Sequence, residues 1–75
     1  MRSHTLPSGE IVELEATNNG NPPGVLGMTT AHPAQWLRID GGPWERVRGM
    51  SQFRAVQWLD VCDDAADVRE VLLDD

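Results

Sequence analysis

Alternating apolar and polar positions near the start of the chain predict a β-hairpin. In the run Val12-Glu13-Leu14-Glu15-Ala16, three apolar side chains share one face of a strand and two glutamates share the other. Turn-forming residues at 7–9 separate this strand from an earlier one at 4–6. The turn residues predict a turn centred on Ser8 and Gly9. In that register His4 lies opposite Glu13.

A second hairpin is predicted over 35–48, after a loop at 17–24 whose Asn, Gly and Pro residues propagate neither strand nor helix. Centring its turn on Gly41 and Gly42 pairs Arg38 with Glu45 across the strands. In this register Trp36 and Val47 lie on one face of the hairpin. The other face carries Leu37, Ile39 and Trp44. Because both faces carry a tryptophan, we expect this hairpin to meet something on each side.

Helical spacing follows from Ser51, the predicted N-cap, to residue 73. The region is expected to form one helix or two, with a break at Asp63-Asp64, and a strand over 56–62 is the alternative for its first part because those residues also tolerate β structure. Two apolar series support the helical prediction: Phe53, Val56, Leu59 and Cys62, and then Val61, Ala65, Val68 and Leu72.

These elements predict an α+β fold in one small domain over 1–75. Two hairpins within 3–48 form a small antiparallel sheet, and the helical region 51–73 packs on one face of it. The expected core takes side chains from both parts: Leu6, Val12, Leu14, Leu37, Ile39, Trp44, Phe53, Val56, Leu59, Val61, Val68 and Leu72. A core of this size gives marginal stability, so self-association or a permanent partner is expected.

Composition narrows the class of protein. A chain of 75 residues is too short for a multidomain enzyme, and its single cysteine excludes an intrachain disulfide. No apolar run approaches the roughly 18 residues of a membrane span, and no signal peptide is evident. All six basic residues are arginine, which is typical of a GC-rich genome such as that of an actinobacterium or its phage. We expect a cytoplasmic protein, or a virion component if the chain is phage-encoded.

Negative charge is concentrated at the C-terminal end. The net charge is −6, and residues 60–75 hold seven acids and only Arg69. Five of the acids fall at alternating steps of three and four: Asp60, Asp63, Asp67, Glu70 and Asp74. On one helix they form an acidic stripe about 21 Å long, whose like charges repel each other. A basic partner surface would relieve that repulsion, so these residues and Trp36 are the predicted partner-binding residues.

The catalytic inventory is poor. Cys62 lies in an apolar helical pattern and is expected in the core rather than as a nucleophile. His4, His32 and Cys62 lack the spacing of metal ligands, and no phosphate-binding glycine motif occurs. We therefore expect no enzymatic activity, cofactor or metal.

The segment Thr5-Leu6-Pro7-Ser8-Gly9-Glu10-Ile11-Val12-Glu13-Leu14 resembles the opening hairpin of some phage tail-assembly chaperones. The likeness covers ten of 75 residues and implies no site residue. The leading expectation is a small non-enzymatic protein–protein interaction or accessory protein. An alternative is an acidic DNA mimic that inhibits a nucleic-acid-binding protein. Direct nucleic-acid binding through Arg46, Arg48 and Arg54 is a weaker third option, because three arginines oppose an excess of acids.

Overall fold

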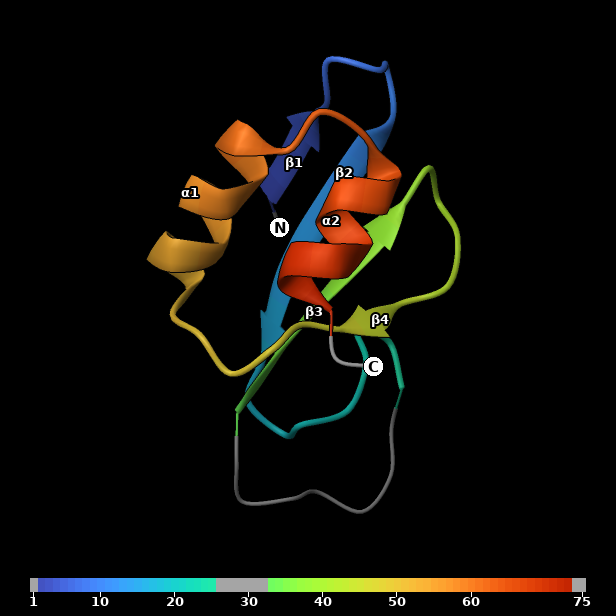
Figure 1. Cartoon of the computed structure of the whole chain (residues 1–75). Helices are drawn as coiled ribbons and strands as arrows, with labels where there is room; N and C mark the ends of the chain where they lie inside the picture. The colour runs from blue at the N-terminus through green and yellow to red at the C-terminus, as the bar shows by residue number, and fades with distance from the viewer. Residues whose placement is uncertain (1, 26–32, 74–75) are drawn as a thin grey trace.

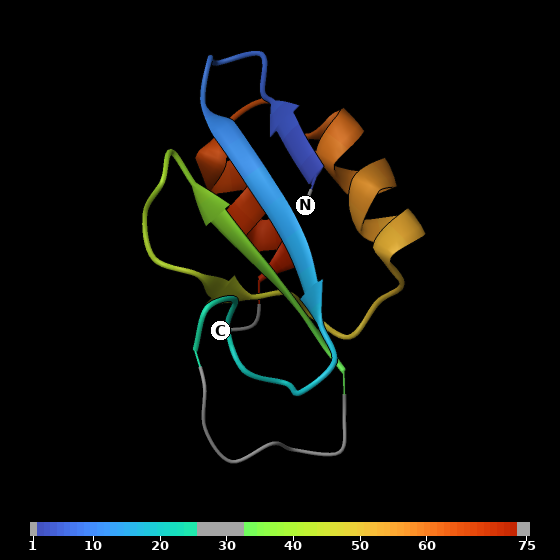
Figure 2. The same ribbon diagram turned by 180° about the vertical axis from the view of Figure 1, so that it is seen from behind.

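The computed structural model describes residues 2–25 and 33–73 (Figure 1). In chain order the elements are β1 (Arg2–Thr5), β2 (Ile11–Thr17), β3 (Ala34–Ile39), β4 (Glu45–Arg46), α1 (Gln52–Val61) and α2 (Ala65–Leu72). The four strands form one antiparallel sheet in the order β1-β2-β3-β4. Both helices lie on the same side of it, α2 across the middle and α1 beside β1 (Figures 1 and 2). The predicted α+β fold is confirmed.

The first hairpin forms one residue out of the predicted register. His4 lies opposite Val12, so its predicted pairing with Glu13 is wrong. The cause is the loop length. The Leu6 N–H donates to the Glu10 carbonyl, and the Gly9 N–H donates to the Leu6 carbonyl, both at 2.8 Å. Gly9 has φ 99°, a left-handed conformation that closes a three-residue loop.

The second hairpin is also shifted. Its turn is centred on Asp40 and Gly41, which have φ 51° and 73°, the pattern of a two-residue hairpin turn. Beyond the turn Leu37 lies opposite Glu45, so the predicted pair of Arg38 with Glu45 does not form. A shift of one residue exchanges the two faces of a strand. Val47, predicted to share a face with Trp36, is therefore buried in the core at 3% exposure.

The core lies between the sheet and the two helices. Its buried cluster comprises Leu6, Val12, Leu14, Leu37, Val47, Ala55, Leu59, Cys62, Val68, Leu72 and Leu73. Phe53 and Val61 were predicted in the core, but they are 73% and 67% exposed. The series that contains Phe53 took every third residue, which drifts around a helix. The series that begins at Val61 assumed one continuous helix, but α1 ends at Val61 and α2 begins at Ala65. The buried residues of α1 and its C-cap instead follow steps of four and three: Ala55, Leu59 and Cys62.

The helical region is two helices rather than one. The Ser51 hydroxyl accepts a hydrogen bond from the Arg54 N–H at 3.1 Å, which confirms the predicted N-cap of α1. Asp64 caps α2 by accepting from the Asp67 N–H at 3.0 Å, and the Asp67 carboxylate accepts from the Asp63 N–H at 3.1 Å. These two hydrogen bonds fix the break at the predicted position. Neither helix described is long and apolar enough to cross a membrane.

The first hairpin holds the beginning of α2. The Glu10 carboxylate accepts hydrogen bonds from the Ser8 hydroxyl at 2.6 Å and from the Ala65 N–H at 3.1 Å. The Ser8 N–H donates to the Asp63 carbonyl at 3.1 Å. A negative charge at the start of a helix satisfies its unpaired N–H groups and its dipole. The hairpin loop therefore fixes where α2 starts.

Arg48 holds the other end of α2. Its guanidinium donates to the Leu73 carbonyl at 2.9 Å and to the Glu70 carbonyl at 3.2 Å. Its N–H donates to the Leu72 carbonyl at 2.7 Å, beside a bridge between Val47 and Leu73. A cation at a helix C-terminus satisfies the last carbonyls and the dipole. Contacts from the rest of the chain therefore fix α2 at both ends.

Candidate functional site

The acidic residues predicted to bind a partner do not form one continuous stripe. Asp60 lies in the last turn of α1, Asp63 in the link between the helices, and Asp67 and Glu70 on α2. Asp74 lies outside the described residues. Because the chain leaves the helical path at 62–64, the regular spacing that a DNA mimic would use ends there. The role of these residues in partner binding remains a proposal.

Their local contacts differ. Asp67 is half-buried and caps the link, so its carboxylate has a structural partner. Asp60, Asp63 and Glu70 are exposed. The Asp60 carboxylate lies 3.7 Å from the His4 imidazole of β1. Asp60 and Asp63 therefore give a negative charge to the surface around the end of α1 and the link, whereas Glu70 lies towards the other end of α2.

The helices leave one face of the sheet open (Figure 2). Trp36 lies on that face, because the adjacent Leu37 is buried on the other. It is opposite Glu15 on one side and Arg46 on the other, and it is half-buried. Its indole Nε1 is buried without a hydrogen-bond partner. A donor hidden in this way is not available to a docking protein, so Trp36 offers a partner only its ring.

The neighbouring positions on the open sheet face are balanced in charge. The Arg38 guanidinium donates to both oxygens of Glu13, at 2.8 and 3.1 Å, and lies 4.6 Å from the centre of the Trp44 ring. The hydrogen bond from Arg38 lowers the pKa of the Glu13 carboxyl. Arg38 and Glu13 thus satisfy each other, and this part of the face has little left to bind a charged partner.

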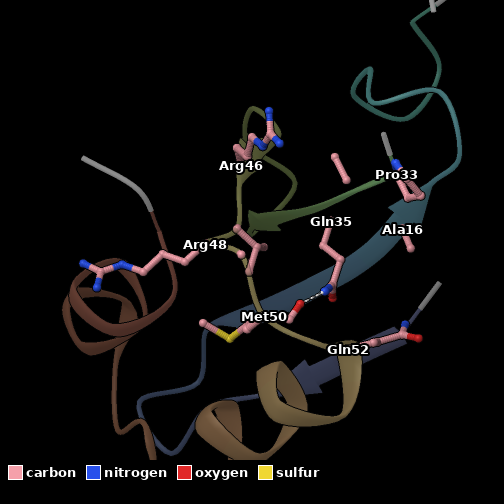
Figure 3. A pocket seen from close by; sticks show the side chains of 10 residues that line it. Ala16, Pro33, Gln35, Arg46, Arg48, Met50 and Gln52 are labelled. Atoms are coloured by element: carbon pink, nitrogen blue, oxygen red, sulfur yellow. Dashed lines mark hydrogen bonds between the residues drawn. The ribbon is translucent and has the colours of Figure 1, made fainter. Parts of the chain in front are cut away.

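A hollow of about 410 Å³ opens at the end of the sheet where β3 begins (Figure 3). It is lined by Ala16, Pro33, Ala34, Gln35, Arg46, Val47, Arg48, Gly49, Met50 and Gln52. The Gln35 amide donates to the Met50 carbonyl, and its Oε1 atom is buried without a partner. The titratable side chains of the wall are Arg46 and Arg48, and Arg48 is bound to the end of α2. Among the described residues, the lining contains no carboxylate, imidazole or thiol for acid–base or nucleophilic chemistry.

Other reactive side chains are isolated or hidden. Cys62 is a free thiol at 3% exposure, which confirms its predicted place in the core. His32 lies outside the described residues. In the two described stretches, no group of three or more His, Cys, Asp or Glu side chains is placed to hold a metal ion.

Cys62 is expected to resist thiol reagents while the chain is folded. Burial raises the pKa of the thiol, and the negative charges of Asp67, Asp63 and Asp64 raise it further. Because the pKa is higher in the folded chain, folding favours the protonated thiol. The stability that the protonated thiol contributes is therefore fully present below the ordinary pKa of 9.0, and it is lost as the pH rises through the higher folded-state pKa. We expect urea titrations to show an alkaline loss of stability that is smaller in Cys62→Ala. An equal loss in both proteins would contradict this.

The outer face of α1 is an apolar feature that the sequence pattern did not predict. Three of its side chains are exposed: Phe53 at 73%, Val61 at 67% and Trp58 at 39%. Phe53, Gln57 and Val61 are spaced by four residues, so they follow one side of the helix, opposite Ala55 and Leu59. The spacing of four between Phe53 and Gln57 and between Gln57 and Val61 is visible in the sequence. Apolar residues at helical spacing usually mark the buried side of a helix, so Phe53 and Val61 were predicted in the core.

A shallow hollow of about 230 Å³ lies on this face, lined by Arg54, Gln57, Trp58 and Val61. Arg54 is exposed at the beginning of the helix, and Asp60 is exposed near its end. We define the α1 outer face as Phe53, Arg54, Gln57, Trp58, Asp60 and Val61. It combines an apolar centre with opposite charges towards its two ends, which is the composition of a surface that docks another protein.

Comparison of the chain with protein-family models, with curated proteins and with solved structures finds no match.

Proposed function

We propose that the chain is a small non-enzymatic protein–protein interaction domain that binds its partner through the α1 outer face. The observation that carries the proposal is the clustering of exposed apolar side chains. Of the five large apolar side chains exposed in the described residues, three lie on α1: Phe53, Trp58 and Val61. Single exposed apolar side chains are ordinary on protein surfaces, whereas three on the outer side of one helix, of which Trp58 and Val61 line the same hollow, favour an interaction site.

The charges around this face support a partner with basic groups. Asp60 and Asp63 are exposed at one end of α1, and residues 60–75 carry the whole net charge of −6. A partner that fits would place apolar side chains on Phe53 and Val61 and a positive group beside Asp60. The predicted acidic residues then act as the rim of the interface rather than as its centre. A cytoplasmic location belongs to the same proposal, supported by the unpaired thiol of Cys62.

Site-specific photo-crosslinking tests the proposal. Gln57 is replaced by a benzophenone-bearing amino acid in one chain, and the exposed Thr5 of β1 is replaced in a control chain. Each is irradiated in the purified state and in a lysate of a GC-rich bacterium. We expect a discrete protein adduct from position 57 and none from position 5. Adducts from position 5 alone, or none from position 57, would contradict a docking role for α1.

A further inference from the structure

The charges of α1 are placed against its own dipole. A helix is stabilised by acids in its first turn and bases in its last turn, because its N-terminus is positive and its C-terminus negative. In α1 the first turn has no acid but contains Arg54, and the last turn has no base but contains Asp60. Within one molecule this arrangement is unfavourable at both ends. A neighbouring helix that ran in the opposite direction would make both charges favourable.

We propose that the partner of the α1 outer face is a second copy of this chain, with the two α1 helices packed antiparallel about a two-fold axis. This inference rests on the proposed function and specifies its partner. In the antiparallel pair, Arg54 of each copy lies beside the negative end of the other α1. Asp60 of each copy lies beside the positive end of the other. The α1 outer face is therefore complementary in charge to the same face of a second copy, as a two-fold interface requires.

The apolar side chains fit the same symmetry. Gln57 lies at the centre of the face, since successive residues turn by about 100° and this places it opposite the midpoint of Ala55 and Leu59. Phe53 and Val61 are each four residues from Gln57 along α1. A two-fold axis at Gln57 brings Phe53 of one copy to the level of Val61 of the other. Both exposed apolar side chains are then covered in each copy.

The net charge decides between the two possible directions of packing. A parallel pair would place Asp60 and Asp63 of one copy beside the same residues of the other. In an antiparallel pair with its axis at Gln57, the two Asp60 residues lie about 9 Å apart along the helices, and the two Asp63 residues lie farther apart, so both separations exceed the screening length of about 8 Å at physiological salt. Charge thus disfavours the parallel pair.

The small size of the α1 outer face sets the expected affinity of the dimer. A contact through one helix of ten residues falls below the roughly 800 Å² per partner that stable interfaces bury. We therefore expect a weak dimer in rapid exchange with the monomer. Sedimentation equilibrium of the unmodified chain, from about 10 μM to about 1 mM, should show a rise from monomer to dimer mass. Monomer mass throughout that range would overturn the inference.

Disulfide trapping tests the geometry. In a Cys62→Ala background, Gln57→Cys places a thiol at the centre of the face, and Gln52→Cys places one at the first residue of α1, outside the face. Packed antiparallel helices bring the two residues at 57 within about 6 Å between Cα atoms, which a disulfide can span. The two residues at 52 lie about 15 Å apart along the axis. We expect oxidation to form covalent dimers at least about tenfold faster from Gln57→Cys than from Gln52→Cys.

Three outcomes separate the inference from the function on which it rests. Equal trapping rates at the two positions, or faster trapping at position 52, would overturn the antiparallel pair. Adding Phe53→Ser should remove the advantage of position 57, and a retained advantage would also overturn it. If the photo-crosslinked adduct from position 57 has a mass other than twice that of the chain, the docking function stands and the second copy is excluded. Circular dichroism confirms that each variant is folded.

Discussion

Replacing Leu59 by alanine is expected to lower the free energy of unfolding by about 2–5 kcal/mol, because truncating a buried leucine loses apolar contacts and leaves a cavity. Leu59 is 2% exposed and belongs to the core cluster between α1 and the sheet. A domain of 75 residues has a total stability of only about 4–11 kcal/mol. The variant should therefore lose a large part of its stability, which urea titration followed by circular dichroism would measure.

Phe53→Ala is the matched control on the same helix. Phe53 is larger than Leu59, but it is 73% exposed, so its truncation should change the free energy of unfolding by less than about 0.5 kcal/mol. The titration is run at low micromolar protein, where the weak dimer is dissociated. A loss as large as that of Leu59→Ala would mean that Phe53 is buried within the monomer. The α1 outer face would then not be free to dock a partner.

Arg48→Met is expected to lower the free energy of unfolding by about 1–2 kcal/mol. The substitution keeps an aliphatic side chain but removes the hydrogen bonds from the guanidinium to the Glu70 and Leu73 carbonyls. Those carbonyls lie at the end of α2, where a positive charge also favours the helix dipole. Thermal unfolding followed by circular dichroism gives the change in stability.

Arg54→Met is the matched control for Arg48. Arg54 is also exposed, but it lies in the first turn of α1, where a positive charge opposes the dipole. Its removal should leave the stability of the monomer unchanged or slightly higher. If both substitutions lower the free energy of unfolding equally, the loss comes from removing any positive charge. The hydrogen bonds of Arg48 to the end of α2 would then not be the cause.

The order and type of the elements could be predicted because local signals agree there. Two glutamates alternate with apolar residues in β2, and Gly9 and Gly41 allow the turns that each hairpin needs. Register could not be predicted, since it depends on which residues of a turn accept positive φ. Asp40 takes such a conformation although it is not glycine, and its carboxylate accepts from the Ile11 N–H at 2.9 Å. That contact joins residues 29 positions apart, which no local pattern reveals.

The candidate site was harder to predict than the fold. The acidic stripe assumed an uninterrupted helix, but aspartate side chains bind backbone N–H groups and so favour helix ends over interiors. Asp64 and Asp67 do so at the start of α2. The α1 outer face was not predicted, because apolar residues at helical spacing are usually buried. Phe53 and Val61 follow the helical period, but on the side away from the sheet.

Dilution of the ¹⁵N-labelled chain, followed by amide chemical shifts in NMR spectra, tests the central claim most directly. If the α1 outer face docks a second copy, the amides of Phe53, Gln57 and Val61 should shift progressively with protein concentration. The amide of Ile11, at the edge of the open sheet face, should stay constant. Phe53→Ser should abolish the shifts without unfolding the chain. Spectra that do not change with concentration, or changes confined to the sheet, would contradict the account.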